Sequence, residues 1–93
     1  MGAQKRERLE VIYDILKVIK DNNNSIKPTP LLRFSNLSFN SYKEYYSELL
    51  AKKFIKEMED KKGKKFITLT DKGFDYLSEY NVIKNFIRDF DLD

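Results

Sequence analysis

The fold is decided by residues 36–73, which read NLSFNSYKEYYSELLAKKFIKEMEDKKGKKFITLTDKG. The beginning of this stretch has the apolar spacing of an amphipathic helix, and two short segments of nearly alternating character follow, as in strands. A lysine-rich turn around Gly63 separates the two segments. Near the end stands Thr70, a residue type that commonly caps a helix. This part of the chain therefore predicts a helix, a two-stranded ribbon and the start of another helix.

The first predicted helix of this stretch spans residues 38–52, with Ser38 as its N-cap. Its expected inward side chains are Leu37, Tyr42, Tyr46, Leu49 and Leu50, and its expected outward ones are Asn40, Ser41, Lys43, Glu44 and Ser47. Short polar side chains allow a helix to approach base edges in the major groove of DNA. We therefore predict base reading by Asn40, Ser41, Lys43 and Glu44. An ordinary solvated helix face is the alternative interpretation.

The ribbon is expected over residues 54–70, and we call it the wing. Residues 52–65 hold seven lysines against three acids, and Gly63 can supply the positive φ of a hairpin turn. The lysines around this glycine are the predicted phosphate contacts: Lys61, Lys62, Lys64 and Lys65. A solvated turn is the alternative. The position of the wing directly after the predicted reading helix favours phosphate binding.

Two further helices are predicted before this stretch. Residues 6–22 carry two adjacent apolar stripes, one with Leu9 and the other with Val11, so this helix is either central or shared with a partner. Thr29 can cap a short helix over residues 30–35, which is expected to bury Leu31, Leu32 and Phe34 and to offer Arg33 to a phosphate. Two short helices joined by a tight turn give helix-turn-helix geometry.

The last predicted helix spans residues 71–90, and Phe74 and Leu77 are expected to pack on the domain. Five apolar residues then follow at steps of four and three, which is the spacing of a helix–helix seam: Tyr76, Tyr80, Ile83, Ile87 and Phe90. A chain of 93 residues has little core left to cover such a seam. We therefore predict a homodimer through this seam, and folding back onto the same domain is the alternative.

The composition narrows the classes of function. Residues 1–93 are expected to form a single α+β domain that is mostly α. The chain contains no cysteine and no histidine, which are the commonest metal ligands and the commonest catalytic bases. We therefore expect no enzyme activity, no metal and no cofactor. The chain has no apolar run of about 18 residues, so no membrane partner is expected, and the predicted location is the cytoplasm.

The same residues carry a resemblance to a known family. Asn36-Leu37-Ser38 before the reading helix, the glycine-tipped wing and the run Leu69–Gly73 resemble small archaeal winged helix-turn-helix DNA-binding proteins. That group includes chromatin-associated members that dimerise through a C-terminal helix. The resemblance implies a winged helix-turn-helix fold with a three-helix core, a two-stranded wing and a C-terminal dimerisation helix. The acidic tail of this chain departs from the chromatin group, so a packed helical-hairpin dimer is expected instead of a long coiled coil.

Two functions remain open from the sequence. The first is a homodimeric transcriptional regulator that binds double-stranded DNA in the cytoplasm, associated with the nucleoid. The second is a winged-helix module that binds proteins and not DNA. The net charge of only +3 favours the second, as do Glu44 and Glu48, which would repel a phosphate that they faced.

Overall fold

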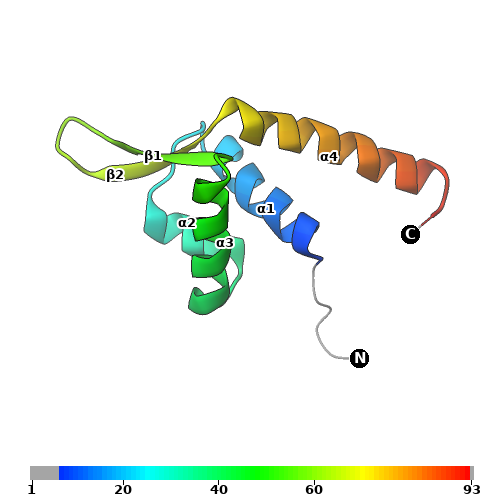
Figure 1. Ribbon diagram of the computed structural model, residues 1–93, viewed down its shortest axis with the longest axis horizontal. Coiled ribbons are helices and arrows are strands. Elements are labelled where there is room, and N and C mark those ends of the chain that lie inside the picture. The colour runs from blue at the N-terminus through cyan, green and yellow to red at the C-terminus, as the bar shows by residue number, and fades with distance from the viewer. Residues whose placement is uncertain (1–6, 93) are drawn as a thin grey trace.

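The computed structural model describes residues 7–92 and contains four helices and a two-stranded antiparallel sheet (Figure 1). The elements in chain order are α1 (Arg8–Asp21), α2 (Pro28–Ser35), α3 (Phe39–Ala51), β1 (Ile55–Glu59), β2 (Lys65–Leu69) and α4 (Asp71–Asp89). The predicted mostly helical α+β architecture is therefore confirmed. Residue 6, where the first helix was expected to begin, lies outside the described residues.

The core lies where α1 packs against α2, α4 and β2, and α3 adds Tyr42 and Leu49 to it. α1 supplies a large share of it through Val11, Ile12, Ile15, Leu16 and Ile19. This helix is thus central to the domain, which was the first of the two predicted alternatives. Leu9 was expected in the same apolar stripe but is 56% exposed.

α2 begins two residues earlier than predicted and leaves Phe34 exposed. It starts at Pro28, and Thr29 is not its cap. Both prolines lie in the first turn, where a missing N–H breaks no helical hydrogen bond. The prediction that Phe34 is buried was wrong, since Phe34 is 53% exposed. Leu31 is fully buried and Leu32 packs against the core, both as predicted; Ser35, four residues after Leu31, is also buried, and its hydroxyl donates to the Leu32 carbonyl at 2.7 Å.

The turn between α1 and α2 adds a short third segment to the sheet. Ile26 and Ile67 exchange two backbone hydrogen bonds of 3.2 and 2.8 Å, although only this one pair is involved. Asn24 has a positive φ of 57°, which asparagine tolerates better than most residues, and its side-chain oxygen accepts from the Leu69 N–H at 2.7 Å. These contacts fix the α1–α2 turn against β2.

The predicted caps on both sides of the wing are confirmed. The Ser38 hydroxyl accepts from the Ser41 N–H at 3.2 Å at the start of α3, and the Thr70 hydroxyl accepts from the Gly73 N–H at 3.2 Å at the start of α4. β1 and β2 pair antiparallel from Ile55 opposite Leu69 to Glu59 opposite Lys65. α3 therefore leads directly into the wing, and the wing leads directly into α4.

Candidate nucleic-acid interface

The outward side of α3 presents small polar groups and one cation. Asn40, Lys43, Glu44 and Ser47 are all exposed, and their spacing places them on one face of the helix. Three of these four were predicted to read bases. Ser47 belongs to the same face and was predicted only to point outward. The arrangement offers an amide, an ammonium group and a hydroxyl to whatever approaches α3.

Ser41 was also predicted to read bases but lies to one side of this face. It is half-buried, and its N–H is committed to the Ser38 cap. Glu44 lies beside Arg8, Tyr45 and Glu48, which together line a small hollow between α3 and the first turn of α1. Asn40, Lys43 and Glu44 thus share one face of α3, and Glu44 lies at the edge of that face nearest α1.

Two cationic side chains pair with the Glu48 carboxylate. It forms ion pairs with Arg8 and, at 2.6 Å, with Lys52. Arg8 also lies over the Tyr45 ring, 5.9 Å from its centre. The repulsion of phosphate that Glu48 suggested in the sequence is reduced, because two cations accompany this carboxylate.

The wing turn is built by Asp60. Its carboxylate accepts from the N–H groups of Lys62 and Lys64 at 2.8 and 2.9 Å, and its carbonyl accepts from the Gly63 N–H at 2.9 Å. Gly63 has a φ of 79°, the left-handed conformation that the residue after such a turn adopts. The acid that dilutes the charge of the wing is thus the residue that shapes the turn.

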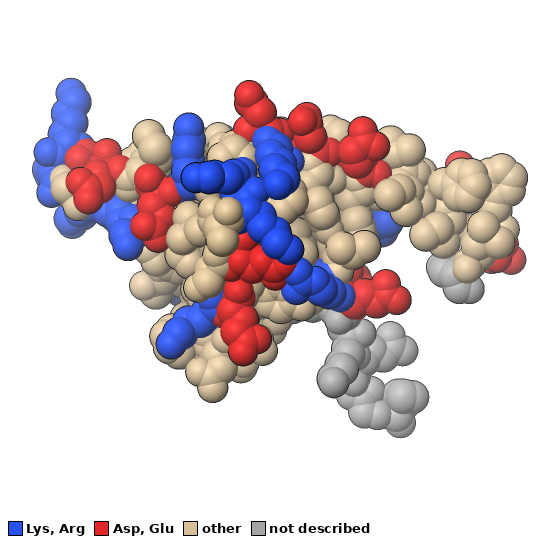
Figure 2. All heavy atoms as spheres, viewed as in Figure 1, with Lys and Arg blue, Asp and Glu red and all other residues tan. Residues whose placement is uncertain are grey.

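The predicted phosphate contacts differ in their surroundings. All four wing lysines are exposed, and Arg33 is exposed on the last turn of α2. Among the described residues, Lys65 alone of the four wing lysines forms an ion pair, with Glu57 at 3.5 Å. The other three extend from the tip. Figure 2 shows the resulting concentration of basic side chains at the far end of the wing.

Glu57 also joins the wing to α3. Its carboxylate accepts a 2.5 Å hydrogen bond from the Tyr46 hydroxyl. Burial, and then the hydrogen bond to Glu57, raise the pKa of Tyr46 well above the usual range for tyrosine, so the hydroxyl keeps its proton at alkaline pH values where an ordinary tyrosine loses it. One carboxylate therefore links the middle of α3, through Tyr46, to Lys65 on the neighbouring strand.

The first half of the predicted seam on α4 packs within the domain. The Tyr76 hydroxyl donates to the Leu9 carbonyl at 2.6 Å, and its ring meets Phe54 edge to face at 5.6 Å. Tyr80 stacks on Tyr13 of α1 at 4.7 Å. Both tyrosines were predicted at a dimer interface; in the structure Tyr80 packs on α1, and Tyr76 contacts α1 and Phe54, the residue before β1.

The second half of α4 carries uncovered apolar side chains. Ile83 and Phe90 from the predicted seam are exposed, and Ile87 is half-buried. Three further apolar residues were not predicted there: Val82, Phe86 and Leu92. The spacing of four residues from Val82 to Phe86 to Phe90 is the signal that could have found two of them. We call residues 82–92 the arm.

The arm ends in a regular helix-termination motif. The Leu92 N–H donates to the Ile87 carbonyl at 2.9 Å, and the Asp91 N–H donates to the Arg88 carbonyl at 3.1 Å, while Asp91 has a φ of 58°. This pair of bonds is the Schellman motif, which closes helices and usually brings the last apolar side chain back onto the final turn. Leu92 thereby continues the apolar surface of the arm.

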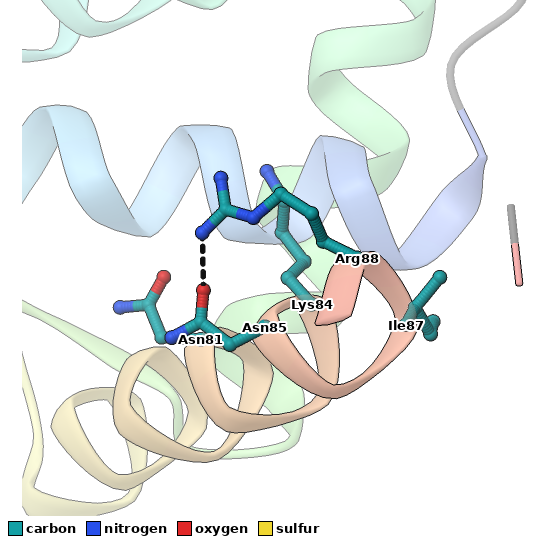
Figure 3. Close-up of a pocket in the computed structure, with 5 residues that line it drawn as sticks. All are labelled: Asn81, Lys84, Asn85, Ile87 and Arg88. Carbon is teal, nitrogen blue, oxygen red and sulfur yellow. Dashed lines mark hydrogen bonds between the residues drawn. The ribbon is translucent and has the colours of Figure 1, made fainter. Parts of the chain in front are cut away.

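The other side of the arm is polar and borders a hollow of about 360 Å³ (Figure 3). The residues that line it are Asn81, Lys84, Asn85, Ile87 and Arg88. Arg88 donates to the Asn85 side-chain oxygen at 2.7 Å, Asn81 accepts from the Tyr13 hydroxyl at 3.0 Å, and Lys84 lies 5.6 Å from the centre of the Tyr13 ring. Asn81 and Lys84 thus make the polar contacts of this part of α4 with α1. The phenylalanines of the arm remain exposed.

Among residues 7–92, no group of three or more His, Cys, Asp or Glu residues is placed to hold a metal ion. Within the same range, no helix combines the length and the apolar character that a membrane crossing requires.

Comparisons with known proteins agree with this architecture. A family model described as winged helix-turn-helix matches residues 5–88. The uncharacterized protein MJ0290 of Methanocaldococcus jannaschii is 32% identical over 73 residues, which are 78% of this chain. The chain spans about a third of the length of that relative, since the match covers 31% of it.

Two solved structures share the fold. The winged-helix DNA-binding protein F93 from STIV superposes with a TM-score of 0.70 at 25% identity, over 85% of this chain and 90% of that one. Sso10a-2, a DNA-binding protein from Sulfolobus solfataricus, gives a TM-score of 0.72 at 14% identity, over 91% of this chain and 85% of that one. The second likeness concerns the fold alone.

Proposed function

Because this chain belongs to the winged helix-turn-helix family, we propose that it binds double-stranded DNA as a homodimeric transcriptional regulator. The observation that carries the proposal is the polar outward face of α3 beside the lysine-tipped wing. A helix with short polar side chains can enter the major groove, and a basic ribbon next to it can hold the phosphates that border the groove. The likeness to F93 from STIV, itself described as DNA-binding, supports this proposal.

The proposed contacts divide into base reading and phosphate binding. Asn40 can pair with an adenine edge and Lys43 with a guanine edge, because these bases present the matching acceptors and donors in the major groove. Lys61, Lys62 and Lys64 extend from the wing tip to the phosphates. Phosphate contacts position the protein, while base contacts supply sequence preference.

Dimerisation is proposed through the arm. It exposes a row of apolar side chains, including Phe86 and Phe90, whose rings pack on each other at 4.8 Å. The acidic residues Asp71, Asp75 and Glu79 lie on the outer side of the preceding turns of α4, so an apolar contact between two copies would be confined to the arm. In Figure 2 the upper edge of α4 changes accordingly from acidic to uncharged. The proposal places this dimer in the cytoplasm, on the nucleoid.

The DNA-binding part is tested by the salt dependence of binding to a fluorescent duplex. In Lys62→Ala/Lys64→Ala two phosphate contacts are lost, so the slope of log affinity against log salt should fall by about 1.8. The matched control is Lys17→Ala/Lys20→Ala, which removes the same charge from exposed positions of α1 and should leave the slope unchanged. Equal slopes for the two double variants would remove the wing from the interface.

Sedimentation of the intact protein with and without the duplex tests both parts together. The expected result is a dimer that sediments faster when DNA is added. A failure of micromolar protein to bind any duplex at low salt would instead favour the protein-interaction function.

A further inference from the structure

Phe39 occupies the first position of α3 and is exposed to solvent over 60% of its surface. It is not needed to start the helix, because Ser38 supplies the cap and Leu37 packs against the core just before it. The ring is unusual mainly because it lies at the N-terminal end of the predicted reading helix. The N-terminal residues of a reading helix are those that contact base edges.

The ring is held beside the predicted base-reading side chains. The Lys43 ammonium group lies 5.3 Å from the centre of the Phe39 ring, one helical turn away, and Asn40 is the next residue along the chain. A cation over the face of an aromatic ring attracts it and limits its rotation. An amide, an ammonium group and an apolar ring thus share the first turns of α3.

The major groove offers such a ring one apolar group. Guanine, cytosine and adenine present only nitrogen and oxygen acceptors or donors there, whereas thymine also presents its 5-methyl group. A phenylalanine that enters the groove therefore has one favourable base contact. Against the other base edges, the phenylalanine ring would displace water from polar groups without offering them a hydrogen bond.

We infer that Phe39 contacts the 5-methyl group of a thymine and makes this protein prefer thymine at one position of each half-site. This inference rests on the proposed function, because it requires α3 to enter the major groove. Lys43 positions the ring, and Asn40 reads a neighbouring base.

The test begins with selection of bound duplexes from a random-sequence pool by the intact protein. Each thymine of the selected site is then replaced in turn by deoxyuridine, which differs only by the missing methyl group. At the contacted position this replacement should weaken binding of the unaltered protein about fourfold, the factor expected for one buried methyl group. For Phe39→Ala the same replacement should have no effect.

The matched control is Phe34→Ala. Phe34 has a similar exposure but lies on α2, beside Asp14 and Asp21 of α1. This variant should bind the selected site normally and keep the fourfold response to deoxyuridine. Circular dichroism of both variants checks that their folds are intact.

Four outcomes would overturn the inference. Equal responses of Phe39→Ala and the unaltered protein at every thymine would show that another residue senses the methyl group. Selection of a site without thymine, or salt-sensitive binding without any enriched sequence, would remove methyl reading while leaving phosphate binding by the wing intact. Absence of binding to the whole pool at low salt would reject the proposed function itself, and the inference with it.

Discussion

At the scale of the residue, two glycines are required for different physical reasons. Gly63 has a positive φ of 79° and open space around it, so a side chain there would be strained by the backbone alone. Gly73 lies in the first turn of α4, where an added Cβ would come within 2.4 Å of the Phe54 carbonyl oxygen. That oxygen already accepts from the Thr70 N–H and hydroxyl, both at 3.1 Å, so it cannot easily move away.

We therefore predict that Gly73→Ala lowers the free energy of unfolding by about 1–3 kcal/mol, the usual range for overpacking, although alanine is the better helix former. Gly63→Ala should cost about 1 kcal/mol from backbone strain. Urea unfolding of both variants measures the difference. Ser78→Ala, exposed on the same helix, is the control, and a Gly73→Ala variant as stable as that control would contradict the close approach.

At the scale of the element, the hydrogen bond from Tyr46 to Glu57 sets how α3 meets the wing. Tyr46→Phe removes the hydroxyl and keeps the ring. We expect this variant to bind duplex DNA several-fold more weakly, because the reading helix and the phosphate-binding ribbon lose a shared anchor. The salt slope should stay unchanged, since no phosphate contact is removed. A changed slope with normal affinity would contradict this role of Glu57.

The arm is predicted to act independently of the core. Phe86→Asp should shift the protein from dimer to monomer in sedimentation and leave its unfolding transition cooperative, because the side chain is 56% exposed. Leu77→Ala, in the buried part of the same helix, should instead lower the free energy of unfolding by about 2–5 kcal/mol. Phe34→Asp tests whether any new surface charge has the same effect. A dimer that survives Phe86→Asp would remove the arm from the interface.

At the scale of the whole molecule, stability should depend on alkaline pH through its buried tyrosines. Burial, and then the neighbouring Tyr80, raise the pKa of Tyr76 to about 12, and burial also raises the pKa of Tyr42. A tyrosine in the unfolded chain loses its proton near pH 10. The folded state is therefore favoured fully below about pH 10, and this contribution is lost as the pH rises to about 12.

The expected observation is a free energy of unfolding that falls between about pH 10 and pH 12, with a shallower fall in Tyr76→Phe. Urea titrations at a series of pH values measure both curves. Parallel curves for the two proteins would show that Tyr76 does not contribute to the pH dependence.

The parts of the fold that the sequence predicted well depend on residues close together in the chain. Ser38 and Thr70 were recognisable as caps because each bonds an N–H only three residues ahead. The exposure of Phe34 could not be predicted, because it depends on which side of α2 packs against α1. The pairing of Glu48 with Arg8 joins residues 40 positions apart. No local pattern indicates such a pair.

The seam on α4 is used in two different ways along its length, and the sequence could not separate them for a related reason. Apolar steps of four and three describe a helix that packs on another helix, whether that helix belongs to the same chain or to a second one. Only the arrangement in space shows that Tyr76 packs against Phe54 and Tyr80 against α1. The exposed apolar surface of the arm continues the same periodicity. The sequence therefore does not show where packing within the domain ends and the exposed surface begins.

In the proposed dimer, the arm would also fix how far apart the two reading helices lie. A rigid helix fixes the distance and the rotation between the DNA-binding part of one copy and the surface that would contact the second copy. Each residue of the helix contributes about 1.5 Å and 100°. One alanine inserted between Tyr80 and Asn81 would turn the arm by about 100°. The two reading helices of the dimer would then no longer have the relative orientation that they need on DNA. Seven inserted residues would restore that orientation to within about 20° while lengthening each of the two arms by about 10 Å, roughly the rise of three base pairs of DNA. The length of one exposed helix would then set the spacing of the two half-sites.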